Sequence, residues 1–132
     1  MAMERILIVE DNPFFRQFLK ETLHSRFPSI DILEAADGAG ALERIETSSP
    51  DIILMDLRLP GENGLELTKK IKAQHPDIIV VMITNYDLPE YREAAYQCKV
   101  DHFVTKDHFL KMIQSVLTEE DIDQGDPDRK LL

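Results

Sequence analysis

Five short apolar runs recur along the chain at intervals of about 24 residues. They are Ile6–Val9, Ile30–Leu33, Ile52–Leu57, Ile78–Thr84 and Phe103–Thr105. Residues 6–9, 52–55 and 78–81 do not alternate with polar positions, which is typical of strands in a parallel sheet that is covered on both faces. The pattern therefore predicts five buried strands.

Helical patterns lie between these runs. Two apolar stripes have helical spacing, and we assign both to packing against the sheet: Phe14, Phe15, Phe18, Leu19 and Leu23, and then Phe109, Ile113, Val116 and Leu117. Helix starts are predicted at Asn12-Pro13, at Asn63 with Glu66, at Asp87 with Glu90, and at Asp107. Each interval between runs is long enough for a strand, a helix and two loops, so the sequence predicts an α/β fold, a doubly wound (βα)₅ parallel sheet.

Composition narrows the class of protein. We expect one domain over residues 4–118, followed by an acidic tail or linker over residues 119–132, which holds six acids and two bases. The net charge of −10 argues against direct nucleic-acid binding by this chain. The apolar runs are too short to span a membrane, and the single Cys98 allows no internal disulfide, so we expect a cytoplasmic protein.

Polar residues follow four of the five predicted strands. Glu10 and Asp11 follow the first, Asp56 the third, Thr84 the fourth and Lys106 the fifth, whereas Glu34 at the second offers little. The carboxyl ends of parallel strands share one sheet edge, where open α/β sheets bind ligands. Clustered carboxylates favour a bound cation, and oxygen ligands suit Mg²⁺. With a lysine and a hydroxyl nearby to bind phosphoryl oxygens, an aspartate can act as a nucleophile and form an aspartyl phosphate.

These segments resemble the response-regulator receiver family over residues 4–118. The matching pieces are Ile6-Leu7-Ile8-Val9-Glu10-Asp11, Asp51-Ile52-Ile53-Leu54-Met55-Asp56, Pro60-Gly61-Glu62-Asn63-Gly64, Val81-Met82-Ile83-Thr84 and Phe103-Val104-Thr105-Lys106. The resemblance implies a flavodoxin-like fold with strand order 2-1-3-4-5. It also implies a set of site residues: Asp56 as phosphoacceptor, Asp11 as a direct Mg²⁺ ligand, Glu10 as a ligand through water, the backbone carbonyl of Arg58 as a further ligand, Thr84 and Lys106 as the phosphoryl-binding pair, and Phe103 as the aromatic that swings inward on activation.

The resemblance also implies partners. The phosphoryl donor would be a phosphohistidine on a sensor histidine kinase or a phosphotransfer protein, and an output domain beyond residue 132 is one arrangement seen in such proteins. The face of helix 4, strand 5 and helix 5 would change on phosphorylation and form a homodimer or meet an effector. We expect the chain not to be an enzyme that acts on a separate substrate. It would catalyse only its own Mg²⁺-dependent phosphorylation and its own slow dephosphorylation. Asn85 and Asp107 depart from the family's usual residues, and we expect Arg58 and Tyr86 to shield the acyl phosphate from water.

Two other classes compete with this interpretation. One is a receiver-like docking module that is never phosphorylated. The other is an α/β enzyme, but no G-x-G-x-x-G follows the first strand and the sequence holds no P-loop. A metal hydrolase would need grouped histidines, whereas His24, His75, His102 and His108 are scattered.

Overall fold

The computed structural model describes residues 5–85 and 87–113, and five parallel strands form one sheet in these residues. The strands are β1 (Arg5–Val9), β2 (Asp31–Ala35), β3 (Ile52–Asp56), β4 (Ile79–Thr84) and β5 (His102–Thr105). Their order is β2-β1-β3-β4-β5. The predicted doubly wound α/β fold and its strand order are therefore confirmed.

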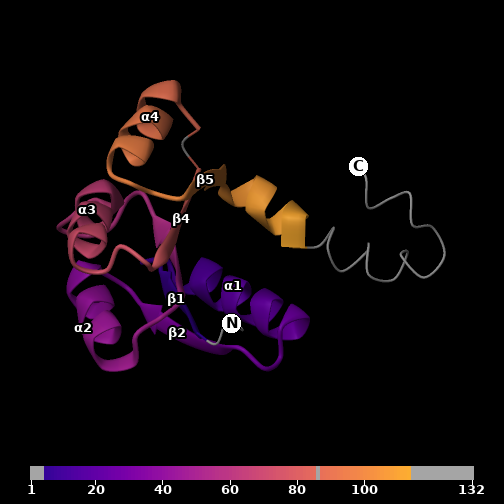
Figure 1. Cartoon of the computed structure of the whole chain (residues 1–132). Coiled ribbons are helices and arrows are strands. Elements are labelled where there is room, and N and C mark those ends of the chain that lie inside the picture. The colour runs from indigo at the N-terminus through magenta and orange to yellow at the C-terminus, as the bar shows by residue number, and fades with distance from the viewer. Residues whose placement is uncertain (1–4, 86, 114–132) are drawn as a thin grey trace.

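Four helices connect the strands, and a further helical segment follows β5. They are α1 (Pro13–Arg26), α2 (Gly38–Ser48), α3 (Gly64–Gln74), α4 (Pro89–Gln97) and residues 106–113. Figure 1 shows α2 and α3 on one side of the sheet and α1 on the other, with the segment after β5 on the side of α1.

The core has two halves because the sheet is covered on both faces. Leu7 and Val9 of β1 pack with α2 and α3, and the alternate residues Ile6 and Ile8 pack with α1 and with Phe109. Successive side chains of a strand point to opposite faces, so a strand with two buried faces is apolar at every position. The continuous apolar runs in the sequence have this cause.

Two of the predicted helix caps are confirmed. The side chain of Asn12 accepts hydrogen bonds from the backbone N–H groups of Phe14 and Phe15, and that of Asn63 accepts one from Glu66. Each satisfies N–H groups that the first helical turn leaves unpaired.

The other two cap predictions are wrong. Leu88 occupies the N-cap of α4, because Pro89 begins the helix and holds the residue before it in an extended conformation. Asp87 instead accepts a hydrogen bond from Arg92. Thr105 Oγ1 accepts from the backbone N–H of His108, so the last helix begins one residue after β5 and Asp107 lies inside its first turn.

The aromatic stripe of α1 is only partly buried. Leu19 and Leu23 are in the core as predicted, but Phe14 is 84% exposed and Phe18 is 45% exposed. The predicted stripe is wider than the arc of the helix that faces the sheet. Val116, Leu117 and the acidic tail lie outside the described residues. Within residues 5–85 and 87–113, the helices are all too short or too polar to cross a bilayer.

Candidate functional site

Three carboxylates meet where β1 and β3 end. Glu10 directly follows β1, Asp56 is the last residue of β3, and the register aligns Val9 with Met55. One carboxylate oxygen each from Glu10, Asp11 and Asp56 lie within 4.8 Å of one another. Glu10 and Asp56 are buried, with 1% and 6% of their surface exposed, whereas Asp11 is open to solvent. The predicted acidic cluster is thus formed, with one side accessible.

Lys106 supplies the positive charge of this cluster. Its Nζ lies 2.7 Å from Glu10 Oε1 and 3.7 Å from Asp56 Oδ2. The same ammonium lies 4.5 Å from the centre of the Phe15 ring, a cation–π arrangement. Lys106 therefore pairs more closely with Glu10 than with Asp56, and α1 lines one side of its position.

The ionisation of Asp56 is opposed by its surroundings. Burial is the largest cause and the negative charge of Glu10 the next, and together they raise the pKa of Asp56 to about 7. The charge of Lys106 and a hydrogen bond from the backbone of Arg58 act in the opposite direction but do not cancel the effect. A divalent cation beside the carboxylate would favour its charged form.

The donor set fits Mg²⁺. All three side chains offer oxygen, and Mg²⁺ binds through one or two carboxylates while keeping several waters. Glu10 Oε2 accepts a hydrogen bond from the backbone of Asn12. Glu10 Oε1 is buried without an aligned hydrogen bond from any described residue, although the Lys106 ammonium is adjacent. Buried acceptors in need of positive charge are what a cation would satisfy.

The loop after β3 folds back onto Asp56. The backbone N–H of Gly64 donates to the carbonyl of Leu57 at 2.7 Å. A Cβ at position 64 would overlap the backbone carbonyl oxygen of Asp56. Only glycine lets the start of α3 approach the end of β3 this closely, so the backbone around Asp56 is tightly fixed.

The structure places the remaining predicted residues around this edge. Thr84 is fully buried at the end of β4, one position beyond the partner of Asp56 in the register. Phe103 is buried, with the Arg92 guanidinium 4.9 Å from its ring centre and Arg92 Nη1 3.3 Å from its carbonyl oxygen. The side chain of Arg58 is exposed. Coordination of Mg²⁺ by its backbone carbonyl stays a prediction. Tyr86 lies outside the described residues.

Two residues near the site were not identified from the sequence. Arg16 of α1 donates to the backbone carbonyl oxygen of Glu10 and to Glu34 of β2. A half-buried acid between the apolar residues Leu33 and Ala35 could have indicated that Glu34 has a charged partner. The identity of that partner depends on how α1 packs on β2.

Comparison with known proteins gives a consistent family. The model of the response regulator receiver domain family matches residues 6–118. The chemotaxis protein CheY of Halobacterium salinarum is 31% identical over 103 residues, which cover 78% of this chain and 84% of that protein. A cyclic di-GMP phosphodiesterase of Thermotoga maritima is 32% identical over 113 residues, 86% of this chain but only 30% of that protein. Several of the curated relatives are thus much longer than this chain.

The fold agrees with solved receiver structures. A CheY-like receiver domain protein from Methanospirillum hungatei has a TM-score of 0.74 at 26% identity, covering 92% of this chain and 99% of that one. The phosphorylated cyanobacterial phytochrome response regulator RcpA has a TM-score of 0.76 at 24% identity, covering 92% and 94% of the two chains. The chain belongs to the response regulator receiver domain family of two-component signalling.

Proposed function

We propose that Asp56 accepts a phosphoryl group from a phosphohistidine of a sensor kinase or phosphotransfer protein, with Mg²⁺ held by Glu10, Asp11 and Asp56. One observation carries the proposal: the buried Asp56 carboxylate lies in one acidic cluster with the carboxylates of Glu10 and Asp11, beside the Lys106 ammonium, and Asp11 opens this cluster to solvent. The backbone carbonyl of Arg58 would complete the ligands from the protein.

The transfer is an in-line displacement. An oxygen of ionised Asp56 forms the new P–O bond as the P–N bond of the donor breaks. The electron pair of that bond returns to the imidazole, which leaves neutral when its other nitrogen carries a proton. Mg²⁺ held by the acidic cluster would reduce the negative charge on the transferring oxygens. Little covalent chemistry is left to the protein beyond the nucleophile, so positioning and charge dominate.

Lys106 and Thr84 have separate parts in this step. The Lys106 ammonium lies within 4 Å of both Glu10 and Asp56, so a short movement brings it onto a phosphoryl oxygen. As Mg²⁺ reaches the carboxylates, it would replace the charge that Lys106 supplies to Glu10. The Thr84 hydroxyl, at the same edge, would donate a hydrogen bond to another phosphoryl oxygen.

Phosphorylation would then change the face of α4, β5 and the segment over residues 106–113. Movement of Thr84 toward the phosphoryl group would alter the space beside Phe103, and the two conformations would differ in population. That face would carry the signal to a second copy or an effector in the cytoplasm. Tyr96, Lys99 and Lys111 are exposed there and available for contact.

Intact-mass spectrometry tests the proposal. The protein is incubated with a small acyl phosphate, with Mg²⁺ or with a chelator, and compared with Asp56→Asn and with Asp77→Asn, an exposed acid elsewhere in the chain. We expect one added phosphoryl group in wild type and Asp77→Asn, only with Mg²⁺, and none in Asp56→Asn. No gain with any donor would favour a docking module that is never phosphorylated.

A further inference from the structure

Arg16 links the acidic cluster of Glu10, Asp11 and Asp56 to the edge of the sheet. From α1, its Nη1 donates to the backbone carbonyl oxygen of Glu10 at 2.7 Å. Its Nε donates to Glu34 Oε1 on β2 at 3.2 Å. The side chain is only 20% exposed. One guanidinium therefore joins α1, β2 and the first residue of the loop that holds two of the three carboxylates.

Glu34 is a firm anchor for this guanidinium. Its second oxygen lies 3.0 Å from Lys20 Nζ. Partial burial by itself raises the pKa of Glu34, but hydrogen bonds and charge attraction from Lys20 and Arg16 outweigh it, so the pKa lies below its usual value. Glu34 is thus ionised at neutral pH and keeps Arg16 oriented by a charge-assisted hydrogen bond.

Three hydrogen bonds hold Glu10 in place. Its N–H donates to the carbonyl of Ala35, its carbonyl accepts from Arg16, and its Oε2 accepts from the N–H of Asn12. Oε1 faces Lys106. The backbone next to Asp11 is therefore fixed before any cation arrives.

We propose that Arg16 is a positioning residue for the cation site. Anchored by Glu34, its guanidinium holds the Glu10 carbonyl in place and so keeps the Glu10 and Asp11 carboxylates converged for Mg²⁺. The inference rests on the proposed function, since it concerns the same cation site. Arg16 does not contact the transferring group, and it acts through Glu10.

The electrostatic effect and the positioning effect of Arg16 predict opposite changes in Mg²⁺ affinity when Arg16 is replaced. The positive charge of Arg16 lies at the Glu10 backbone and repels an incoming cation, so removing the charge alone would tighten Mg²⁺ binding. Loss of the hydrogen bond to Glu10 would loosen the loop and weaken binding. The sign of the change in affinity therefore separates the two roles.

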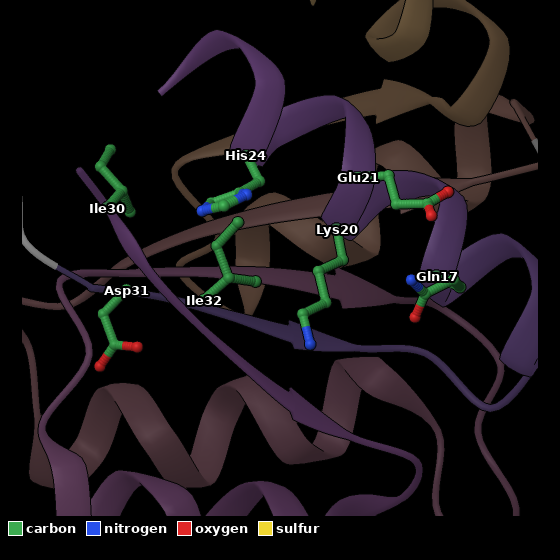
Figure 2. Close-up of a pocket in the computed structure, with 7 residues that line it drawn as sticks. All are labelled: Gln17, Lys20, Glu21, His24, Ile30, Asp31 and Ile32. Carbon is green, nitrogen blue, oxygen red and sulfur yellow. The ribbon is translucent and has the colours of Figure 1, made fainter. Parts of the chain in front are cut away.

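Lys20 provides a matched control. It pairs with the same Glu34 and carries the same charge, but its ammonium binds Glu34 Oε2, whereas Arg16 binds both Glu34 and the Glu10 carbonyl. It lies with Gln17 and Glu21 in a pocket of about 340 Å³ between α1 and β2, where Figure 2 shows its chain extending from the helix toward the strand. Methionine is of similar length to lysine and removes only the charged end of the side chain.

The experiment measures the Mg²⁺ dissociation constant by NMR titration of backbone amides in the full chain, for wild type, Arg16→Met, Arg16→Lys and Lys20→Met. We expect Mg²⁺ to bind about fivefold more weakly to Arg16→Met, from the loss of a charge-assisted hydrogen bond. Arg16→Lys should also bind Mg²⁺ more weakly than wild type, because a lysine ammonium cannot reproduce the two guanidinium hydrogen bonds to the Glu10 carbonyl and to Glu34. Lys20→Met should bind as wild type or more tightly. At saturating Mg²⁺, the phosphorylation rate of Arg16→Met should return to near the wild-type value.

Unchanged or tighter Mg²⁺ binding in Arg16→Met would overturn the inference and leave the proposed function standing. Urea unfolding checks that each variant is folded. If Arg16→Met does not fold, Arg16→Lys carries the test, and wild-type affinity in that variant would overturn the inference. Absence of Mg²⁺-dependent shifts in wild type would overturn both the inference and the proposed metal site.

Discussion

The acidic cluster and the face formed by α4, β5 and residues 106–113, called the α4–β5 face below, are held in different ways. At the acidic cluster, Gly64 packs on the Asp56 carbonyl, and hydrogen bonds to Ala35 and Arg16 fix the backbone of Glu10. At the α4–β5 face, the Arg92 side chain links the Asp87 carboxylate to the backbone carbonyl of Phe103, and the side chains of Arg92 and Asp87 are 44% and 50% exposed. The first region depends on the backbone and on buried charge, and the second on half-exposed side chains.

This difference suits the two tasks. Phosphoryl transfer needs reacting groups held in place, because small displacements are costly in rate. A switch needs two arrangements of similar free energy, and contacts made by exposed side chains contribute little enough to be exchanged. Changes at the acidic cluster should therefore have large effects on stability and on the phosphorylation rate, and changes at the α4–β5 face should have small ones.

The largest effect is expected from Lys106→Met. The variant loses the cation that meets the phosphoryl oxygens, and we expect the phosphorylation rate with a small donor to fall about 100-fold. Mg²⁺ should bind more tightly, since a positive charge 2.7 Å from Glu10 is removed. Lys111→Met, an exposed lysine in the same helical segment, is the control. A rate close to wild type in Lys106→Met would contradict the role given to this lysine.

The backbone around Asp56 is tested by Gly64→Ala. The added methyl group overlaps the Asp56 carbonyl, and we expect the free energy of unfolding to fall by about 2–3 kcal/mol, measured with urea. Phosphorylation should slow as well. Gly61→Ala is the comparison: its φ of 77° strains alanine, but a Cβ there contacts nothing within 4 Å. That variant should lose about 1 kcal/mol and keep its phosphorylation rate. Equal effects of the two substitutions would contradict the account.

Asp56→Asn should stabilise the fold at high pH without Mg²⁺. Because the pKa of Asp56 is raised to about 7, the folded protein binds a proton that the unfolded chain releases near its ordinary pKa of 3.8. Stability is then lost as pH rises from that value through about 7, and the full penalty persists above it. Asparagine avoids the penalty, so we expect a gain on the order of 2 kcal/mol near pH 8 that fades toward pH 4. Urea unfolding across pH measures it, and a gain independent of pH would contradict the assignment.

The smallest effect is expected from Arg92→Met. Its contacts with Phe103 and Asp87 are half-exposed, and we expect a loss of about 0.5 kcal/mol with an unchanged phosphorylation rate. Urea unfolding measures the loss of stability, and intact-mass spectrometry follows the phosphorylation rate. A loss of stability as large as that of Gly64→Ala would remove the contrast between the two regions.

Local and topological features were predictable from the sequence. Asn12 and Asn63 cap helices through atoms two or three residues away, so their role is written in the local sequence. The convergence of Glu10, Asp56 and Lys106 follows from parallel strands that share one edge, once the five runs are recognised.

Features that depend on packing were not predictable. Phe14 has the spacing of a core residue, but which arc of α1 faces the sheet is decided by the tertiary structure. Asp87 has capping-box spacing, yet Pro89 fixes the start of α4 one residue later. The bond between Arg16 and Glu34 joins residues 18 apart in sequence, and no local pattern specifies it.

The most direct test of phosphoryl acceptance at Asp56 is chemical mapping of the modified residue. Borohydride reduces an aspartyl phosphate to homoserine, and peptide mass spectrometry then locates the change. After incubation with a small acyl phosphate and Mg²⁺, we expect homoserine at position 56 and unchanged aspartate at Asp11. Homoserine at another position, or none in protein that has gained the mass of a phosphoryl group, would contradict it.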